Sequence, residues 1–217
     1  AKAASLGAPL IAQGQHWHVS EERGRLVYQD ETGLLDLPPP SLMGAHQFQN
    51  AGAALAGLRH LGLPESSYEA AVTRATWPAR MQKLAKGPLI DAAPEAELWL
   101  DGGHNAACGA TLAESLTRLP ERPTYMICGM LNTKDIAGYL APVVPHIKAL
   151  HAVSIPGEAN TLPAETTAAA ATEAGMSAHA ADSVMSALRD ILRDAPQARI
   201  LICGSLYLAG HILRQHS

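Results

Sequence analysis

The sequence predicts an α/β fold dominated by a Rossmann-like domain with a mostly parallel sheet. After residue 78, short apolar runs alternate with helical segments that begin at capping residues. The apolar runs are continuous, which is typical of strands buried on both faces of a parallel sheet. Hydrophobic residues make up 47% of the 217 residues and charged residues only 17%, so the chain can bury a substantial core.

The alternation after residue 78 defines each expected element. Strands are expected at residues 88–90, 98–100, 125–128, 149–153, 177–179 and 200–203, with helices near 106–119, 135–143, 163–174, 183–194 and 206–214. Asn105, Asp135, Thr161 and Asp182 are suitable helix caps, and Gly175 is a suitable helix terminator.

The first 77 residues follow a different pattern. Strands are expected at 10–12, 16–19 and 25–28, followed by an extended proline connector at 38–40 and a long helix from residue 44 to 58. Ser66–Glu69 has the form of a capping box for a short second helix. Pro78 breaks that helix, so we place a domain boundary there and expect two domains, 1–77 and 78–217.

Composition excludes several classes of protein. The net charge of −4 comes from interspersed signs without a basic stripe, which argues against a nucleic-acid partner, and no apolar stretch is long enough to span a membrane. The three cysteines form no CxxC pair, so we expect no disulfide framework and a reducing, cytoplasmic setting. The chain begins with neither Met nor a signal peptide, and we expect it to be a piece of a longer protein.

The turn at residues 101–105 is the first candidate site. Asp101 follows the apolar run 98–100, two glycines turn the chain, and His104 precedes a helix that Asn105 can cap. An acid and an imidazole therefore lie at the carboxyl end of a strand, the edge of an open α/β sheet where ligands bind. The amino end of a helix also attracts phosphate.

Three further side chains are candidates for binding a ligand. His46 and Asn50 are four residues apart on one helix face and could read the edge of a base. The alternative is helix capping by His46 and Gln47, with Asn50 merely exposed. Arg80 follows a rigid joint and could reach a ligand between domains, although a surface ion pair is the commoner role for such a residue.

Other patterns in the sequence give weaker evidence for a functional site. His16 and His18 would share one strand face with metal-ligand spacing, but no third ligand is evident and a solvated face is favoured. Two apolar runs end alike, in Cys128-Gly129 and Cys203-Gly204, on the edge that holds the Asp101 turn. Neither loop is a GxGxxG or a GxxxxGK[ST], so a complete phosphate cradle is missing, and Ser205 lacks the GxSxG setting of a nucleophile.

Five segments in order resemble one family. Residues 44–51 (GAHQFQNA) resemble the HQxxNAA helix of folylpolyglutamate synthase and dihydrofolate synthase, members of the Mur ligase superfamily. Residues 77–81 (WPARM) resemble its WPGR segment, and residues 101–105 (DGGHN) its DGAHNP turn. Residues 129–135 (GMLNTKD) and 203–210 (CGSLYLAG) match two further loops. The ordered set, from residue 44 to residue 210, is a specific signal.

The resemblance implies an ATP-dependent amide ligase. Such an enzyme adds L-glutamate to dihydropteroate or to folates through an acyl phosphate, in folate biosynthesis and one-carbon metabolism. Residues 1–77 would be the end of a central ATPase domain, and residues 78–217 the whole C-terminal Rossmann-like domain. The phosphate loop and the Mg²⁺ ligands would lie upstream, so the fragment alone is expected to be inactive and to hold no metal. The full-length enzyme is expected to be a monomer whose N-terminal ATPase domain completes the site.

The resemblance also implies roles for single residues. Asn50, with His46 beside it, would contact the adenine of ATP, and Arg80 would contact the phosphates. Asp101 would contact the ribose or orient the nucleotide, and His104 would lie close to the reacting phosphate. Asp101 and His104 are therefore the expected catalytic pair.

Departures from the family pattern are modest. Gly103 replaces the usual Ala, which we expect to be sterically harmless, and Ala106 replaces the usual Pro. Residues 92–96 are expected to be a surface insertion. Two alternatives stay open: a free-standing Rossmann-type nucleotide-binding or interaction module, and a Mur-type ligase of cell-wall precursors.

Overall fold

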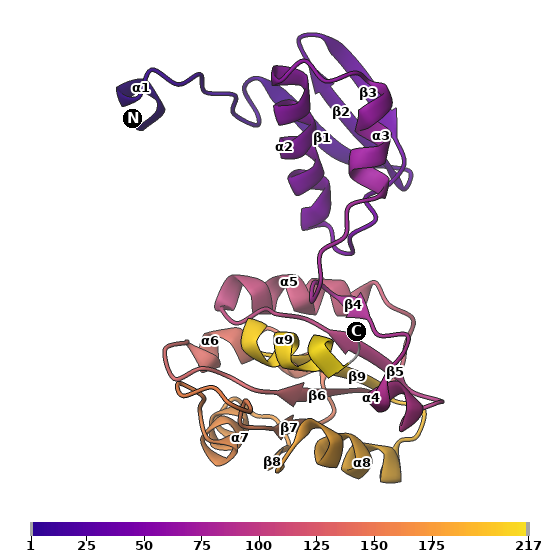
Figure 1. Cartoon of the computed structure of the whole chain (residues 1–217), viewed down its shortest axis with the longest axis vertical. Coiled ribbons are helices and arrows are strands. Elements are labelled where there is room, and N and C mark those ends of the chain that lie inside the picture. Colours follow the sequence, from indigo (N-terminus) through magenta and orange to yellow (C-terminus); the bar gives the residue numbers. More distant parts are fainter. Residues whose placement is uncertain (1, 216–217) are drawn as a thin grey trace. The chain divides into compact units, whose positions relative to one another are not determined.

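The computed structural model describes residues 2–215 and shows a mixed α/β chain (Figure 1). Contacts divide the chain into two compact units, Ala1–Trp77 and Pro78–Ser217. Each unit has its own sheet and its own buried core. In the described part of the chain, no helix has both the length and the apolar character needed to cross a bilayer.

The first unit is a small antiparallel sheet packed against helices. Its elements are α1 (Lys2–Ser5), β1 (Trp17–Glu22), β2 (Arg25–Asp30), β3 (Gly33–Leu37), α2 (His46–His60) and α3 (Ser66–Thr73), and the strand order is β1-β2-β3. Alternate residues of the strands, such as Trp17, Leu26 and Tyr28, are buried with Phe48 and Leu55 of α2. The strands, whose buried side chains alternate, and the helix, whose apolar face repeats about every 3.6 residues, therefore share one core.

Several predictions for the first unit are wrong. Residues 10–12 form no strand, and β1 begins at Trp17, which leaves His16 in a turn where its Nδ1 accepts the Ala12 N–H at 3.0 Å. The strand β3 was not expected. Helix α3 has Glu65 at its N-cap position without a side-chain capping bond, so the predicted capping box is absent there.

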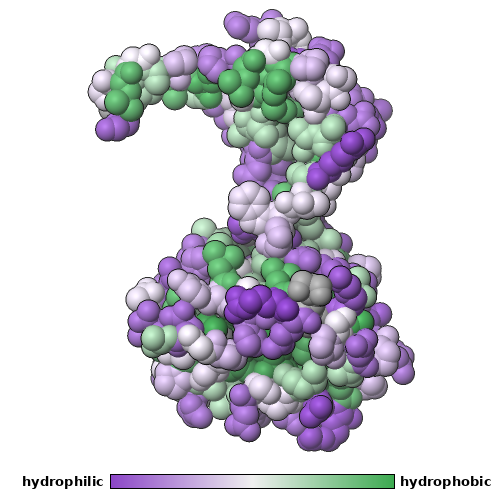
Figure 2. All heavy atoms as spheres, viewed as in Figure 1, coloured by the Kyte–Doolittle hydropathy of each residue, from purple (hydrophilic) through white to green (hydrophobic). Residues whose placement is uncertain are grey.

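The segment that precedes β1 carries apolar side chains at the surface. Leu6 and Leu10 are 67% and 64% exposed. Figure 2 shows apolar atoms along this segment. Between residues 2 and 16 the structure describes one regular helix, the short α1, and residues 10–12 pair with no strand.

The second unit has a six-stranded sheet in the order β4-β5-β9-β6-β7-β8, in which only β4 is antiparallel to its neighbour. The strands are β4 (Gln82–Lys83), β5 (Glu97–Leu100), β6 (Thr124–Cys128), β7 (Leu150–Ala152), β8 (Ala178–Ala180) and β9 (Arg199–Cys203). The predicted mostly parallel sheet is confirmed. The helices are α4 (Pro88–Asp91), α5 (Ala106–Thr117), α6 (Ile136–Leu140), α7 (Ala164–Glu173), α8 (Val184–Asp194) and α9 (Leu206–Gln215), with a 3₁₀ turn at Val144–His146.

Helices cover both faces of this sheet. From β5 the chain proceeds through α5, α6 and α7 in one direction along the sheet to β8, and α8 then returns it to the central strand β9. Buried residues of α8 and α9 join one core with Leu100, Ile127 and Ile202 of the strands. Right-handed crossovers place helices of opposite directions on opposite faces, as in doubly wound folds.

The local signals of the second unit are mostly confirmed. Asn105 caps α5 by accepting the Cys108 N–H, and Asp135 caps α6 by accepting the Gly138 N–H, each at 2.9 Å. Gly175 ends α7 with a φ of 92°, a conformation that glycine adopts without a Cβ penalty.

Two expectations for this unit are wrong, the strand at 88–90 and two of the helix caps, and a third needs qualification. Residues 88–90 lie in the helix α4, because Pro88 stands at a first helical position where its missing N–H leaves no bond unmade. Residues 92–96 lie mostly at the surface, as expected, since Ala92, Pro94 and Glu95 are exposed, although Ala93 is buried. The N-cap residues of α7 and α8 are Pro163 and Ser183, not Thr161 and Asp182.

Helix α5 lies so close to α6 that Gly109 has no room for a side chain. A Cβ at this position would overlap the backbone carbonyl oxygen of Tyr139. We predict that Gly109→Ala destabilises the second unit by about 1–3 kcal/mol, because backbone must move to admit the methyl group. Urea unfolding measures the change.

Gly210→Ala is the matched control, since Gly210 also lies inside a helix of this unit and its Cβ would meet only Arg214 Nη1, at 3.7 Å. We expect this variant to gain about 0.5–1 kcal/mol from helix propensity. A Gly109→Ala protein as stable as the Gly210→Ala protein would contradict the close approach of α5 and α6.

Candidate functional site

The carboxyl ends of three neighbouring strands form one edge of the sheet in the second unit. The Asp101 N–H donates to Ile202 O at 3.0 Å, and the Gly129 N–H donates to Cys203 O at 3.1 Å. The turns that follow β5, β6 and β9 therefore lie side by side. This placement of Asp101, Gly129 and Gly204 on a shared edge was predicted and is confirmed.

The carboxylate of Asp101 is buried and bonded through both oxygens. Its Oδ2 accepts the N–H of Met81 at 2.9 Å, and its Oδ1 accepts the N–H of Gly103 at 2.7 Å. The residue is only 5% exposed. Hydrogen bonds to an ionised acceptor are stronger than neutral ones, so this carboxylate ties the turn at residue 81 firmly to the turn at residues 101–105.

The turn around Arg80 has an unusual backbone. Ala79 and Met81 have positive φ angles, 56° and 42°. Such angles cost a residue with a Cβ about 1–2 kcal/mol. Neighbouring groups hold them in place: Ala79 O accepts the Gly102 N–H at 2.8 Å, and the Ala79 N–H donates to Gln82 Oε1 at 2.9 Å.

Arg80 itself stays available for a ligand. Both of its neighbours in the chain are buried, whereas Arg80 is partly exposed. Within residues 2–215 the guanidinium has no hydrogen-bond or ion-pair partner. The surface ion pair that sequence reasoning left open is thus not found among the described residues, and the planar fork can bind two oxygens of a phosphate.

The imidazole of His104 is oriented by its own turn. Its Nδ1 lies 3.0 Å from Gly102 O, and because a carbonyl can only accept, Nδ1 carries the hydrogen. In the neutral ring, Nε2 is then the group that can accept a proton or a hydrogen bond. No residue between 2 and 215 is bonded to Nε2.

Position 103 has little room for a side chain in this chain. A Cβ there would lie 2.7 Å from Asp101 Oδ1 and 2.9 Å from Cys108 Cβ. Alanine would therefore push against the carboxylate that the Gly103 N–H binds. The turn is packed tightly against the first residues of α5, and the glycine itself causes no clash there, which agrees with the expectation that it is sterically harmless.

Beneath the turns lies a layer of neutral buried groups. Cys128 and Cys203 are paired in register on neighbouring strands, and Tyr139 of α6 is buried beside them. Burial raises the pKa of the Cys203 thiol and the pKa of Tyr139 well above their usual values, so both stay protonated. Ser205 is also buried, and its Oγ accepts the Tyr207 N–H at 3.0 Å.

The first unit carries the other predicted site residues on α2. These are His46 and Asn50, and the buried side chain of Gln47 connects them. Its Nε2 lies 2.9 Å from the Nε2 of His46, and its Oε1 accepts the Asn50 Nδ2–H at 3.0 Å. The alternative of helix capping by His46 and Gln47 is not observed, since α2 has no side-chain cap. Asn50 is exposed and keeps its carbonyl oxygen and one N–H for a ligand.

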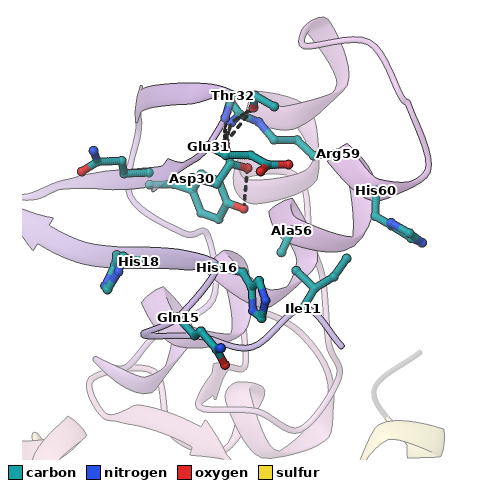
Figure 3. A pocket seen from close by; sticks show the side chains of 12 residues that line it. Ile11, Gln15, His16, His18, Asp30, Glu31, Thr32, Ala56, Arg59 and His60 are labelled. Atoms are coloured by element: carbon teal, nitrogen blue, oxygen red, sulfur yellow. Dashed lines mark hydrogen bonds and ion pairs between the residues drawn. The ribbon is translucent and has the colours of Figure 1, made fainter. Parts of the chain in front are cut away.

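A separate cavity of about 660 Å³ opens on the first unit (Figure 3). Its lining includes His16, His18 and His60 and the ion pair between Asp30 and Arg59. Thr32 and the hydroxyl of Tyr28 also donate to Asp30. Within the described residues, no group of three or more His, Cys, Asp or Glu side chains could hold a metal ion.

Comparison with known proteins gives a consistent match. The family model described as dihydrofolate synthetase, C-terminal domain, matches residues 90–215, more than half of the chain. This chain belongs to that family. A folylpolyglutamate synthase of Lacticaseibacillus casei is 29% identical over 98% of this chain and 49% of its own length.

Solved structures of the folate ligases have the same fold as this family member. The E. coli FolC in complex with DHPP and ADP has a TM-score of 0.81 at 26% identity, over 98% of this chain and 48% of its own. A bifunctional folylpolyglutamate synthase/dihydrofolate synthase with Mn, AMPPNP and L-glutamate bound has a TM-score of 0.79 at 27% identity, over the same shares. The chain thus spans about half the length of the relatives it matches.

Sequence reasoning missed two residues that hydrogen-bond to the candidate site residues or to the turn that carries one of them. Gln47 was considered only as a cap, although the helical spacing of residues 46, 47 and 50 is compatible with the observed bonds. Nothing in the sequence pointed to Gln82. Its bond to the Ala79 N–H depends on the positive φ of Ala79, and an alanine in the sequence does not predict such an angle.

The Asp30–Arg59 pair predicts an acid-sensitive first unit. Burial raises the pKa of Asp30, but bonds from Thr32 and Tyr28 and the charge of Arg59 lower it more, so the net pKa is below its usual value. The ionised carboxylate therefore stabilises the fold above the ordinary carboxyl pKa, and the contribution is lost as the pH falls through the lower folded value. We predict that Asp30→Asn removes about 3 kcal/mol at neutral pH, because a largely buried Arg59 loses its partner.

Asp36→Asn is the control, since Asp36 pairs with Arg25 at the surface and should contribute little. Urea unfolding followed by the amide NMR signals of β1, β2 and β3 at a series of pH values measures both variants. Equal stability of the Asp30→Asn and Asp36→Asn proteins at neutral pH would contradict the structural role of Asp30.

Proposed function

We propose that this chain is part of an ATP-dependent ligase that adds L-glutamate to dihydropteroate, to folates, or to both. ATP phosphorylates a substrate carboxylate, and the amino group of L-glutamate attacks the acyl phosphate. An amide forms and phosphate leaves. Positioning and charge neutralisation dominate in such chemistry, so the protein needs fixed donors more than covalent catalysts.

The names of the relatives support the reaction class. The matched proteins are folylpolyglutamate synthases, and their structures hold ADP, AMPPNP, Mn and L-glutamate. For this chain, ATP and a divalent metal such as Mg²⁺ are the corresponding proposal. The described residues offer no group of three or more metal ligands. We therefore assign Mg²⁺ to ligands in the remainder of a longer protein, where it would neutralise phosphate charge.

One observation carries the proposal: the Arg80 guanidinium, without a partner among residues 2–215, sits on a turn that buried hydrogen bonds fix to the Asp101–Asn105 turn. A cationic side chain on a turn that is bonded to the amino end of a helix suits a phosphate. Both features lie at the ligand-binding edge of a parallel sheet.

The remaining residues take complementary roles in the proposal. Asn50, steadied by Gln47 and next to His46, binds the adenine edge through its free amide groups. Asp101 orients the phosphate-binding turns and can accept a ribose hydroxyl with its remaining lone pairs. His104 offers Nε2 towards the reacting phosphate. We further propose a monomeric, cytosolic enzyme in which an N-terminal ATPase domain completes the site.

Arg80→Ala in the full-length polypeptide tests the proposal. We predict a loss of roughly 10²-fold in ATP-dependent incorporation of glutamate, because the phosphates lose a charged donor. Arg80→Lys should recover part of the loss, since it restores the charge without the fork. Radiolabelled glutamate, with dihydropteroate and a folate offered separately, measures the activity.

Arg193→Ala is the control, because Arg193 makes an exposed ion pair with Asp190 and should leave turnover unchanged. Equal activity of the Arg80→Ala and Arg193→Ala enzymes would overturn the role of Arg80. Activity on cell-wall precursors and not on folates would favour the Mur-type alternative. A parent protein without any phosphate loop would favour a nucleotide-binding or interaction module.

A further inference from the structure

The backbone around Arg80 does not adopt its conformation by default. In the described chain, Ala79, Met81 and Arg23 are the non-glycine residues with positive φ, so two of the three flank the candidate phosphate ligand. Residues with a Cβ rarely hold this conformation unless their surroundings enforce it. The direction of the Arg80 side chain therefore depends on whatever holds residues 79 and 81.

Separate groups hold the two sides of the turn. On the far side, the Met81 N–H is bound by Asp101, a residue already assigned to the site. At Ala79, the N–H of Gly102 binds the carbonyl oxygen but leaves the Ala79 N–H to a different partner. The N–H of Ala79 donates to Gln82 Oε1 at 2.9 Å, and Ala79 is 5% exposed. Without Gln82, this buried N–H would lose its acceptor.

The backbone of Gln82 is held in place by the sheet. It belongs to β4 and pairs in register with Leu100 of β5, directly before Asp101. The side chain thus reaches back three residues from a strand that is anchored to the sheet. Arg80, in contrast, has no partner within residues 2–215 that could orient its guanidinium, so the backbone is the part of the protein that sets its direction.

We propose that Gln82 is a positioning residue for Arg80, which acts through the Ala79 N–H to keep the turn in the conformation that presents the guanidinium. This inference rests on the nucleotide role proposed for Arg80. In this role Gln82 acts on the backbone of the turn and not on the nucleotide or the substrate. Its loss should therefore weaken the use of ATP without removing the charge that binds phosphate.

Gln82→Ala in the full-length polypeptide is the direct test. We expect the KM for ATP to rise about fivefold, the effect of losing one hydrogen bond, with kcat within about twofold of the parent. Amide hydrogen exchange at Ala79 should accelerate by a similar factor. Gln82→Glu keeps an acceptor oxygen at the same place and should restore both values. Lys83→Ala, the next residue of the same strand, removes a surface pair with Glu97 and a contact with the Trp99 ring and should leave both unchanged.

Ala79→Gly separates positioning from mere packing. Glycine adopts a positive φ without a steric penalty, so the turn depends less on the hydrogen bond from Gln82. In the Ala79→Gly background, the rise in KM caused by Gln82→Ala should shrink by at least half. An equal rise in both backgrounds, or a Gln82→Ala protein with unchanged exchange at Ala79, would overturn the inference.

Failure of the proposed function gives a different result. In that case Arg80→Ala also leaves the KM for ATP unchanged, while exchange at Ala79 still reports on the Gln82 bond. If Arg80→Ala raises the KM and Gln82→Ala does not, the function stands and the positioning role of Gln82 is overturned.

Discussion

The buried carboxylate of Asp101 is the interaction on which the candidate site depends. It joins two turns that are 20 residues apart in sequence by accepting the N–H groups of Met81 and Gly103. A charged acceptor with two backbone donors is a strong clamp even at the sheet edge, where the strand ladders have ended. The positive φ angles beside Arg80, the orientation of His104 and the absence of a side chain at position 103 are all compatible with this one clamp.

The sequence predicted the fold of the second unit well because its signals are local. Continuous apolar runs such as 98–100 and 200–203 became central strands, and Asn105 and Asp135 capped helices as expected. Failures occurred where context decided the outcome. Residues 88–90 are apolar enough for a strand, but Pro88 after a glycine starts a helix. The strand β3 forms only because β2 offers it a partner, and residues 10–12 have none.

The candidate site was predictable in its residue types but not in its construction. The five segments that resemble the folate ligases gave Asn50, Arg80, Asp101 and His104, each a side chain whose chemistry suits a nucleotide. The supporting residues Gln47 and Gln82 stayed hidden, because their bonds depend on rotamers and on a left-handed backbone at Ala79. Position 79 is glycine in the WPGR segment that this stretch resembles, and alanine there makes the turn depend more on its neighbours.

A crystal structure of the full-length polypeptide with AMPPNP and a divalent metal is the most direct test of this account. We predict an Arg80 nitrogen within about 3 Å of a phosphate oxygen, with the Met81 and Gly103 N–H groups still bound to Asp101. Phosphates held away from Arg80, or an Asp101 carboxylate that has released both backbone N–H groups, would contradict it.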